Sequence, residues 1–147
     1  MRHKLAFNWV LAAGLAVFAA GAWAEDAGQI KVVSGTVHLQ RGSESLPVKV
    51  GSAVLQSDTL VTGADGSVGV TFTDNSLLSV GPNSVLAIDR YAFDSTTHAG
   101  QFDASLKKGT LAVVSGKMVK QTPGTMRVHT PTSIMGVRGT EFAVRVD

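Results

Sequence analysis

The sequence predicts an all-β protein: a single compact domain of short strands, preceded by a helical signal peptide. Short apolar runs alternate with polar residues at a period of two, and no long stretch has helical periodicity. Glycine, which occurs 16 times, separates these runs together with Asp, Asn and Ser, as closely spaced turns require. This strand spacing fits a β-solenoid and equally a sandwich or jelly roll, and alternation alone does not choose between them.

Residues 1–24 have the pattern of a secretory signal peptide. Arg2 and Lys4 precede an apolar stretch, which ends at Ala22-Trp23-Ala24 with the small residues that a signal peptidase accepts. The stretch is short and rich in alanine compared with the roughly 20 strongly apolar residues of a spanning helix. Cleavage is therefore favoured over an uncleaved inner-membrane anchor. We expect a periplasmic or secreted protein, residues 25–147, with no stable membrane insertion after cleavage.

Charge and cysteine content exclude several classes of function. The chain has 13 basic and 11 acidic residues, and Arg2 and Lys4 account for the difference, so residues 25–147 are formally neutral. A nucleic-acid partner is not expected, because phosphate binding needs clustered basic residues. The absence of cysteine excludes disulfides, thiolate metal sites and cysteine nucleophiles, so stability must come from the hydrophobic core.

Three segments show the clearest strand alternation: residues 36–40, 67–73 and 142–146. In each segment apolar residues occupy one face and polar residues the other, as in a strand with one buried face. The predicted core residues are Val37 and Leu39 in the first segment, Val68, Val70 and Phe72 in the second, and Phe142, Val144 and Val146 in the third.

Turn signals divide residues 58–89 into four predicted strands. Asp65-Gly66, between two apolar pairs, predicts a β-hairpin. Asp74-Asn75-Ser76 and Gly81-Pro82-Asn83 predict two further turns.

Two polar segments, residues 94–100 and 117–124, are predicted to be connections without regular structure. The only local excess of basic residues favours a solvated edge strand that discourages strand addition. Its members are Lys107, Lys108, Lys117 and Lys120.

Catalytic and ligand-binding motifs are absent from the sequence. His38, His98 and His129 lack the spacing of a metal site, and no Gly-x-Ser-x-Gly motif occurs. The spacing does not decide whether two acids such as Asp89 and Asp94 meet in space. Both tryptophans lie in residues 1–24, which leaves few aromatic platforms for sugars. We therefore expect no enzyme activity, no metal and no cofactor.

Three segments together resemble the FecR domain family of bacterial envelope proteins. The first is Val50-Gly51 followed by Asp58-Thr59-Leu60-Val61-Thr62-Gly63, and the second is Val68–Val85, with Asn75 where the family usually has Gly. The third is Leu106–Phe142. It ends in the most specific motif, Val128-His129-Thr130-Pro131-Thr132 and then Gly136-Val137-Arg138-Gly139-Thr140-Glu141-Phe142. The resemblance extends over roughly residues 35–147.

This resemblance implies an all-β, solenoid-like domain in the periplasm. The regulators that name the family receive a signal from an outer-membrane TonB-dependent receptor and pass it through a membrane helix to a cytoplasmic anti-sigma segment. Only about four residues precede the apolar stretch here, so we expect no anti-sigma segment. The expected function is non-enzymatic contact with an envelope protein, either a TonB-dependent receptor or a membrane regulator. The alternative is a structural module that contacts peptidoglycan or lipopolysaccharide.

The signature residues are predicted to be mainly structural. Pro131 favours an extended conformation at Thr130, Gly136 and Gly139 permit turns, and Arg138 offers five donors for turn carbonyls. The predicted signature set is Thr130, Pro131, Gly136, Val137, Arg138, Gly139, Thr140 and Phe142. The predicted partner contacts are the outward residues Arg127, His129 and Arg145.

Overall fold

A computed structural model describes residues 26–147, which fold into twelve strands and one short helix. The all-β prediction is confirmed, and the predicted signal peptide lies outside the described residues. The elements are β1 (Asp26–Ser34), β2 (Val37–Arg41), β3 (Glu44–Pro47), β4 (Ala53–Leu55), β5 (Thr59–Thr62), β6 (Ser67–Phe72), β7 (Leu77–Val80), β8 (Val85–Phe93), β9 (Gly100–Val114), α1 (Lys117–Gln121), β10 (Met126–His129), β11 (Ile134–Val137) and β12 (Glu141–Val146).

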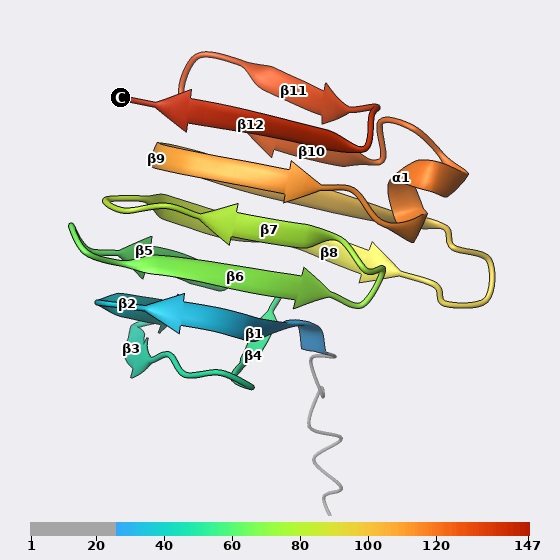
Figure 1. Cartoon of the computed structure of the whole chain (residues 1–147). Helices are drawn as coiled ribbons and strands as arrows, with labels where there is room; N and C mark the ends of the chain where they lie inside the picture. Colours follow the sequence, from blue (N-terminus) through green and yellow to red (C-terminus); the bar gives the residue numbers. More distant parts are fainter. Residues whose placement is uncertain (1–25) are drawn as a thin grey trace, which may run out of the picture.

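The strands form one curled sheet with two layers (Figure 1). The front layer has the order β4-β1-β6-β7-β9-β12, and the back layer has the order β3-β2-β5-β8-β9-β10-β11. All neighbouring strands are antiparallel except β9 and β10, which are parallel. No helix within residues 26–147 is long and apolar enough to cross a membrane.

Strand β9 belongs to both layers. Its first part, residues 100–108, pairs with β8 and β10 in the back layer. Its last part pairs with β7 and β12 in the front layer. The strand turns from one layer to the other at Gly109, where φ is +97° and a Cβ atom would overlap the Ser84 side chain. Both the backbone angle and the close approach require glycine at this point.

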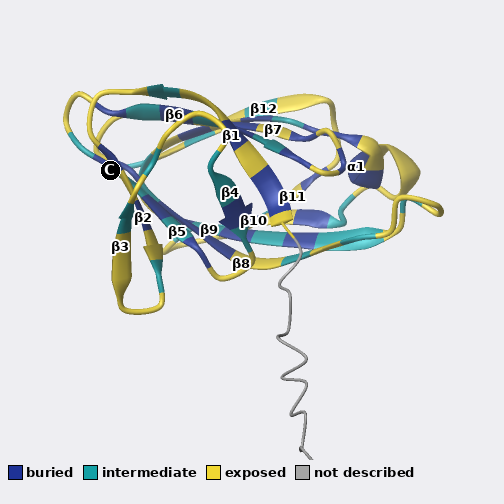
Figure 2. Ribbon diagram, turned by 90° about the horizontal axis from the view of Figure 1, so that it is seen from below, coloured by how far each residue is buried: buried dark blue, intermediate teal, exposed yellow. Residues whose placement is uncertain are grey.

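The core lies between the two layers. Val68, Val70 and Phe72 are each 2 % exposed, as their alternation predicts, and Val37 and Leu39 are also buried. Figure 2 shows buried residues on strands of both layers and an exposed turn between β2 and β3. The layers are therefore held together chiefly by burial of apolar surface. Each Å² of apolar surface removed from water stabilises the fold by about 25 cal/mol.

Three aromatic rings form the centre of one end of the core. Phe72 and Phe102 have ring centroids 4.6 Å apart, and Tyr91 lies 5.0 Å from Phe102. The Tyr91 hydroxyl hydrogen-bonds to Thr73 Oγ1 at 2.7 Å. Burial is the main cause that raises the pKa of Tyr91 to about 12.

The four predicted strands in residues 58–89 are confirmed as β5 to β8, but one predicted hairpin is wrong. Asp65-Gly66 does not close a hairpin, because β5 pairs in the back layer and β6 in the front layer. Instead, Asp65 Oδ1 accepts a hydrogen bond from the Thr36 amide at 3.3 Å. The turn at Asp74-Asn75-Ser76 does close a hairpin, between β6 and β7.

Two predictions for the basic segments are also wrong. The segment 117–124 begins with helix α1, which buries Met118 and Val119, and five residues are too few to show helical periodicity. Lys107 and Lys108 lie in β9, which is not an edge strand, because its residues 102–105 pair with β8 and with β10. Their exposed side chains project from an interior strand.

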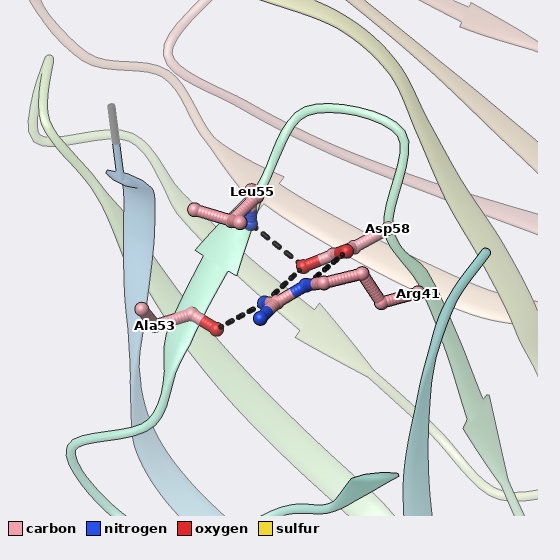
Figure 3. A network of polar contacts seen from close by, with 4 residues as sticks. All are labelled: Arg41, Ala53, Leu55 and Asp58. Atoms are coloured by element: carbon pink, nitrogen blue, oxygen red, sulfur yellow. Dashed lines mark hydrogen bonds and ion pairs between the residues drawn. The ribbon is translucent and has the colours of Figure 1, made fainter. Parts of the chain in front are cut away.

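A buried carboxylate joins the β2–β3 region to the strands that follow (Figure 3). Asp58 is 1 % exposed and accepts hydrogen bonds from Arg41 Nε at 2.9 Å, Arg41 Nη2 at 2.8 Å and the Leu55 amide at 2.8 Å. Arg41 also donates to the Ala53 carbonyl at 3.3 Å. The hydrogen bonds to Asp58 raise the pKa of Arg41 above its usual value.

We expect Arg41→Met to lower the free energy of unfolding by about 2 kcal/mol or more, because it leaves the buried Asp58 carboxylate without its cation. The exposed Lys49→Met is the control, and we expect it to change the free energy little. Denaturant unfolding measures both. A loss of less than about 1 kcal/mol in Arg41→Met would show that this ion pair does not hold the region together.

Candidate functional site

The two layers end unevenly at one side of the molecule. The front layer ends with β12, directly beside β9, whereas the back layer ends with β11, two strands beyond β9. Figure 1 shows β11 reaching past β12. We call β11, β12 and their connections, residues 130–133 and 138–140, the open end. The inner face of β11 therefore has no strand opposite it in the front layer.

A groove of about 410 Å³ lies at the open end between the two layers. Its apolar walls include Met135 from β11 and Val144 and Val146 from β12, which are all half-buried. The turn at residues 130–133 forms one rim, and Lys107, Arg145 and Asp147 add charged groups. The apolar faces of the last two strands are thus only partly covered.

The first half of the signature forms the turn between β10 and β11. The Thr130 amide donates to the Ser133 carbonyl at 2.8 Å, and the Ser133 amide donates to Thr130 Oγ1 at 3.1 Å. Pro131 is exposed in this turn. That Pro131 keeps Thr130 extended stays a prediction.

The second half of the signature carries the chain from β11 to β12. Val137 is buried, and Phe142 points inward from β12 but is only half-buried. The connection is fastened by Ser115 at the end of β9, whose hydroxyl lies 2.7 Å from the Gly139 carbonyl and 3.2 Å from the Thr140 carbonyl. Ser115 was not among the predicted residues. Its position directly after the apolar run 111–114 could have indicated a polar contact at the end of the strand.

Only one of the two signature glycines lies between strands, although a turn was predicted at both. Gly136 lies within β11 and not in a turn. Gly139 lies in the connection, but its φ is outside the left-handed region and a Cβ atom would meet nothing within 4 Å. Neither the backbone nor the packing within residues 26–147 therefore requires glycine at position 139.

Arg138 does not bond to turn carbonyls, contrary to the prediction. Its side chain is exposed, and its guanidinium makes no hydrogen bond or ion pair with any residue from 26 to 147. The carbonyls of Gly139 and Thr140 are bonded by Ser115 instead. Arg138 is thus a solvated cation at the open end.

The three predicted contact residues lie on opposite faces of the molecule. Arg127 and His129 project from the outer face of the back layer, where His129 Nε2 is 3.7 Å from Asp103 Oδ1. Arg145 projects from the outer face of the front layer and pairs with Asp147 at 3.0 Å. Only Arg145 belongs to the open end, because Arg127 and His129 lie on β10, and the three residues do not form one flat surface.

The described residues contain no group of three or more His, Asp and Glu side chains that could hold a metal ion. Asp89 bonds to the Ser105 hydroxyl, and Asp94 accepts the amides of Thr96 and Thr97 at 2.8 and 3.2 Å. These amide hydrogen bonds lower the pKa of Asp94. Asp89 and Asp94 thus hydrogen-bond to different residues.

A comparison with models of protein families shows to which family the chain belongs. The family model described as FecR protein matches residues 58–147, which is more than half of the chain. The chain belongs to the FecR family. Members of this family generally regulate iron-citrate signalling, and FecR domains are typically periplasmic. No curated protein and no solved structure matches the chain.

The matched range includes β5 to β12 and therefore β9, Ser115 and the whole open end. It begins at Asp58, the carboxylate that binds Arg41. Strands β1 to β4 lie before the match but complete both layers. The family resemblance seen in the sequence is confirmed for residues 58–147.

We expect Arg138→Ala to leave the free energy of unfolding within about 0.5 kcal/mol of wild type, because Arg138 is exposed and unbonded. Ser115→Ala should lower it by about 1 kcal/mol, because the Gly139 carbonyl loses its hydroxyl donor, whereas the Thr140 carbonyl keeps the Ser115 amide. Thermal unfolding compares the two variants. A marked fall in melting temperature for Arg138→Ala would restore the structural role that the sequence suggested.

Proposed function

We propose that this chain is a periplasmic, non-enzymatic FecR-like module that binds another envelope protein, in signalling related to the regulation of iron uptake. The open end is the binding region. Its partner is a TonB-dependent receptor or a membrane regulator, the classes with which FecR proteins work. The family relationship supports the signalling role, and the geometry of the strands supports the open end as the binding region.

The free edge of β12 is the observation that carries this proposal. β12 pairs only with β9, so one side of its backbone has no partner in the part of the chain that the structure describes. An exposed sheet edge can receive a strand from another protein, and main-chain hydrogen bonds then supply affinity. Half-buried Phe142, Val144 and Val146 add apolar surface that a partner would cover.

The exposed residues around this edge suit protein recognition. Ile134 is 65 % exposed on β11, Arg138 is exposed in the connection that follows β11, and Arg145 is exposed on β12. Exposed apolar side chains and arginines are both common in protein-binding surfaces. The exposed Arg138 guanidinium makes no hydrogen bond or ion pair within residues 26–147 and is therefore free to contact a partner.

Affinity purification from an envelope extract tests this function. With the wild-type exported chain as bait, we expect a TonB-dependent receptor or a membrane regulator to be enriched. Arg145→Ala should reduce that enrichment several-fold, whereas Arg90→Ala, an exposed arginine on β8 away from the open end, should not.

Two results would count against the proposed function. One is the failure of the wild-type bait to enrich any envelope protein. The other is sedimentation of the chain with isolated peptidoglycan or lipopolysaccharide without enrichment of a protein, which would favour the structural alternative.

A further inference from the structure

We propose that the open end receives a single extended strand of the partner, which adds to the free edge of β12 and covers the inner face of β11. This inference rests on the proposed function and specifies the chemistry of its binding site. It identifies the partner's binding element as a strand with apolar residues on one face and two opposite charges on the other.

The backbone of β12 has three residues directed to the free edge. The Ser115 amide donates to the Thr140 carbonyl at 2.7 Å, so Thr140 directs its carbonyl toward β9. In an antiparallel ladder, alternate residues bond to the same neighbour. Phe142, Val144 and Val146 therefore bond to β9, while Glu141, Ala143 and Arg145 direct their amides and carbonyls outward.

The other free edges are shorter, and one is blocked. β4 has three residues, and β3 and β11 have four each, whereas β12 has six. β3 also contains Pro47, which pairs with His38 of β2. Proline has no amide hydrogen, so β3 lacks one of the donors that would otherwise face its free edge. Prolines and short strands are the usual protection against unwanted strand addition. β12 has neither protection.

The side chains of β12 specify the incoming strand. On the outer face, Glu141 and Arg145 flank Ala143, so the added strand should place a basic residue beside Glu141 and an acidic residue beside Arg145. On the inner face, its apolar residues would continue the row of Phe142 and Val144. The partner segment thus alternates in polarity and carries opposite charges four residues apart.

The uneven layers make room for one strand. Neighbouring strands lie about 4.8 Å apart, and β11 extends one strand position beyond β12. A strand added to β12 would therefore lie over β11 and cover the half-buried Met135 in the groove of about 410 Å³.

The same geometry argues against a second copy of this chain as the occupant. In a two-fold dimer that paired β12 with its own copy, β11 of each subunit would fall at the position of β10 of the other. The back layers would overlap. A partner avoids this clash if it contributes one strand and has no back-layer strand that extends beyond it.

A peptide that repeats residues 140–147 tests the inference, because it has the required alternation and both charges. Hydrogen exchange of the exported, ¹⁵N-labelled chain is measured by NMR with and without an excess of the peptide. We expect exchange of the Glu141, Ala143 and Arg145 amides to slow at least tenfold, and no slowing at Ser45 on the β3 edge.

Ala143→Pro is the decisive variant, because it removes an amide at the free edge and no hydrogen bond to β9. We expect it to abolish the protection by the peptide at Glu141 and Arg145. Ser45→Pro, the matched change on the β3 edge, should leave the protection unchanged. Arg145→Glu, whose parent side chain is 77 % exposed, should weaken peptide binding several-fold without affecting the fold.

Three outcomes would overturn the inference: no protection of the β12 amides, equal protection in wild type and Ala143→Pro, or protection that accompanies self-association of the chain without peptide. The envelope purification separates this failure from that of the proposed function. If wild type and Ala143→Pro enrich the same envelope protein equally, the function stands and the strand-addition site is wrong. If wild type enriches nothing, the function itself fails.

Discussion

The passage of β9 from one layer to the other is the constraint on which the structure depends. This strand pairs with β8 and β10 in the back layer and with β7 and β12 in the front layer. Its turn at Gly109 requires a left-handed backbone and leaves no space for a side chain beside Ser84. Because β9 receives one further strand in front and two behind, the layers end unevenly and the edge of β12 stays free.

The FecR signature lies at this uneven end, and its residues divide into two groups. The Thr130–Ser133 turn and the Gly139 and Thr140 carbonyls, bonded by Ser115, fix the connections. Arg138 makes no such contact and is exposed beside the free edge. Rigid connections that present an unpaired strand are suited to binding, because little conformational freedom remains to be lost on association.

Local pattern predicted the strands but not their partners. Alternation identified the buried Val68, Val70 and Phe72, because successive side chains of a strand point to opposite faces whatever the strand pairs with. The hairpin expected at Asp65-Gly66 is wrong because strand pairing is a long-range property: β5 pairs with β2 and β8. Helix α1 is too short for periodicity to reveal it. The open end could not be predicted, since it follows from the order of strands around β9.

If the free edge of β12 binds the envelope partner as we propose, residues at that edge lie against the partner in the cell. Photo-crosslinking in intact cells tests it most directly, with a photoreactive amino acid placed at position 143 and, as the control, at position 45 on the β3 edge. We expect a crosslink to a specific envelope protein from position 143 and none from position 45. Crosslinking from position 45 alone, or from neither position, would contradict it.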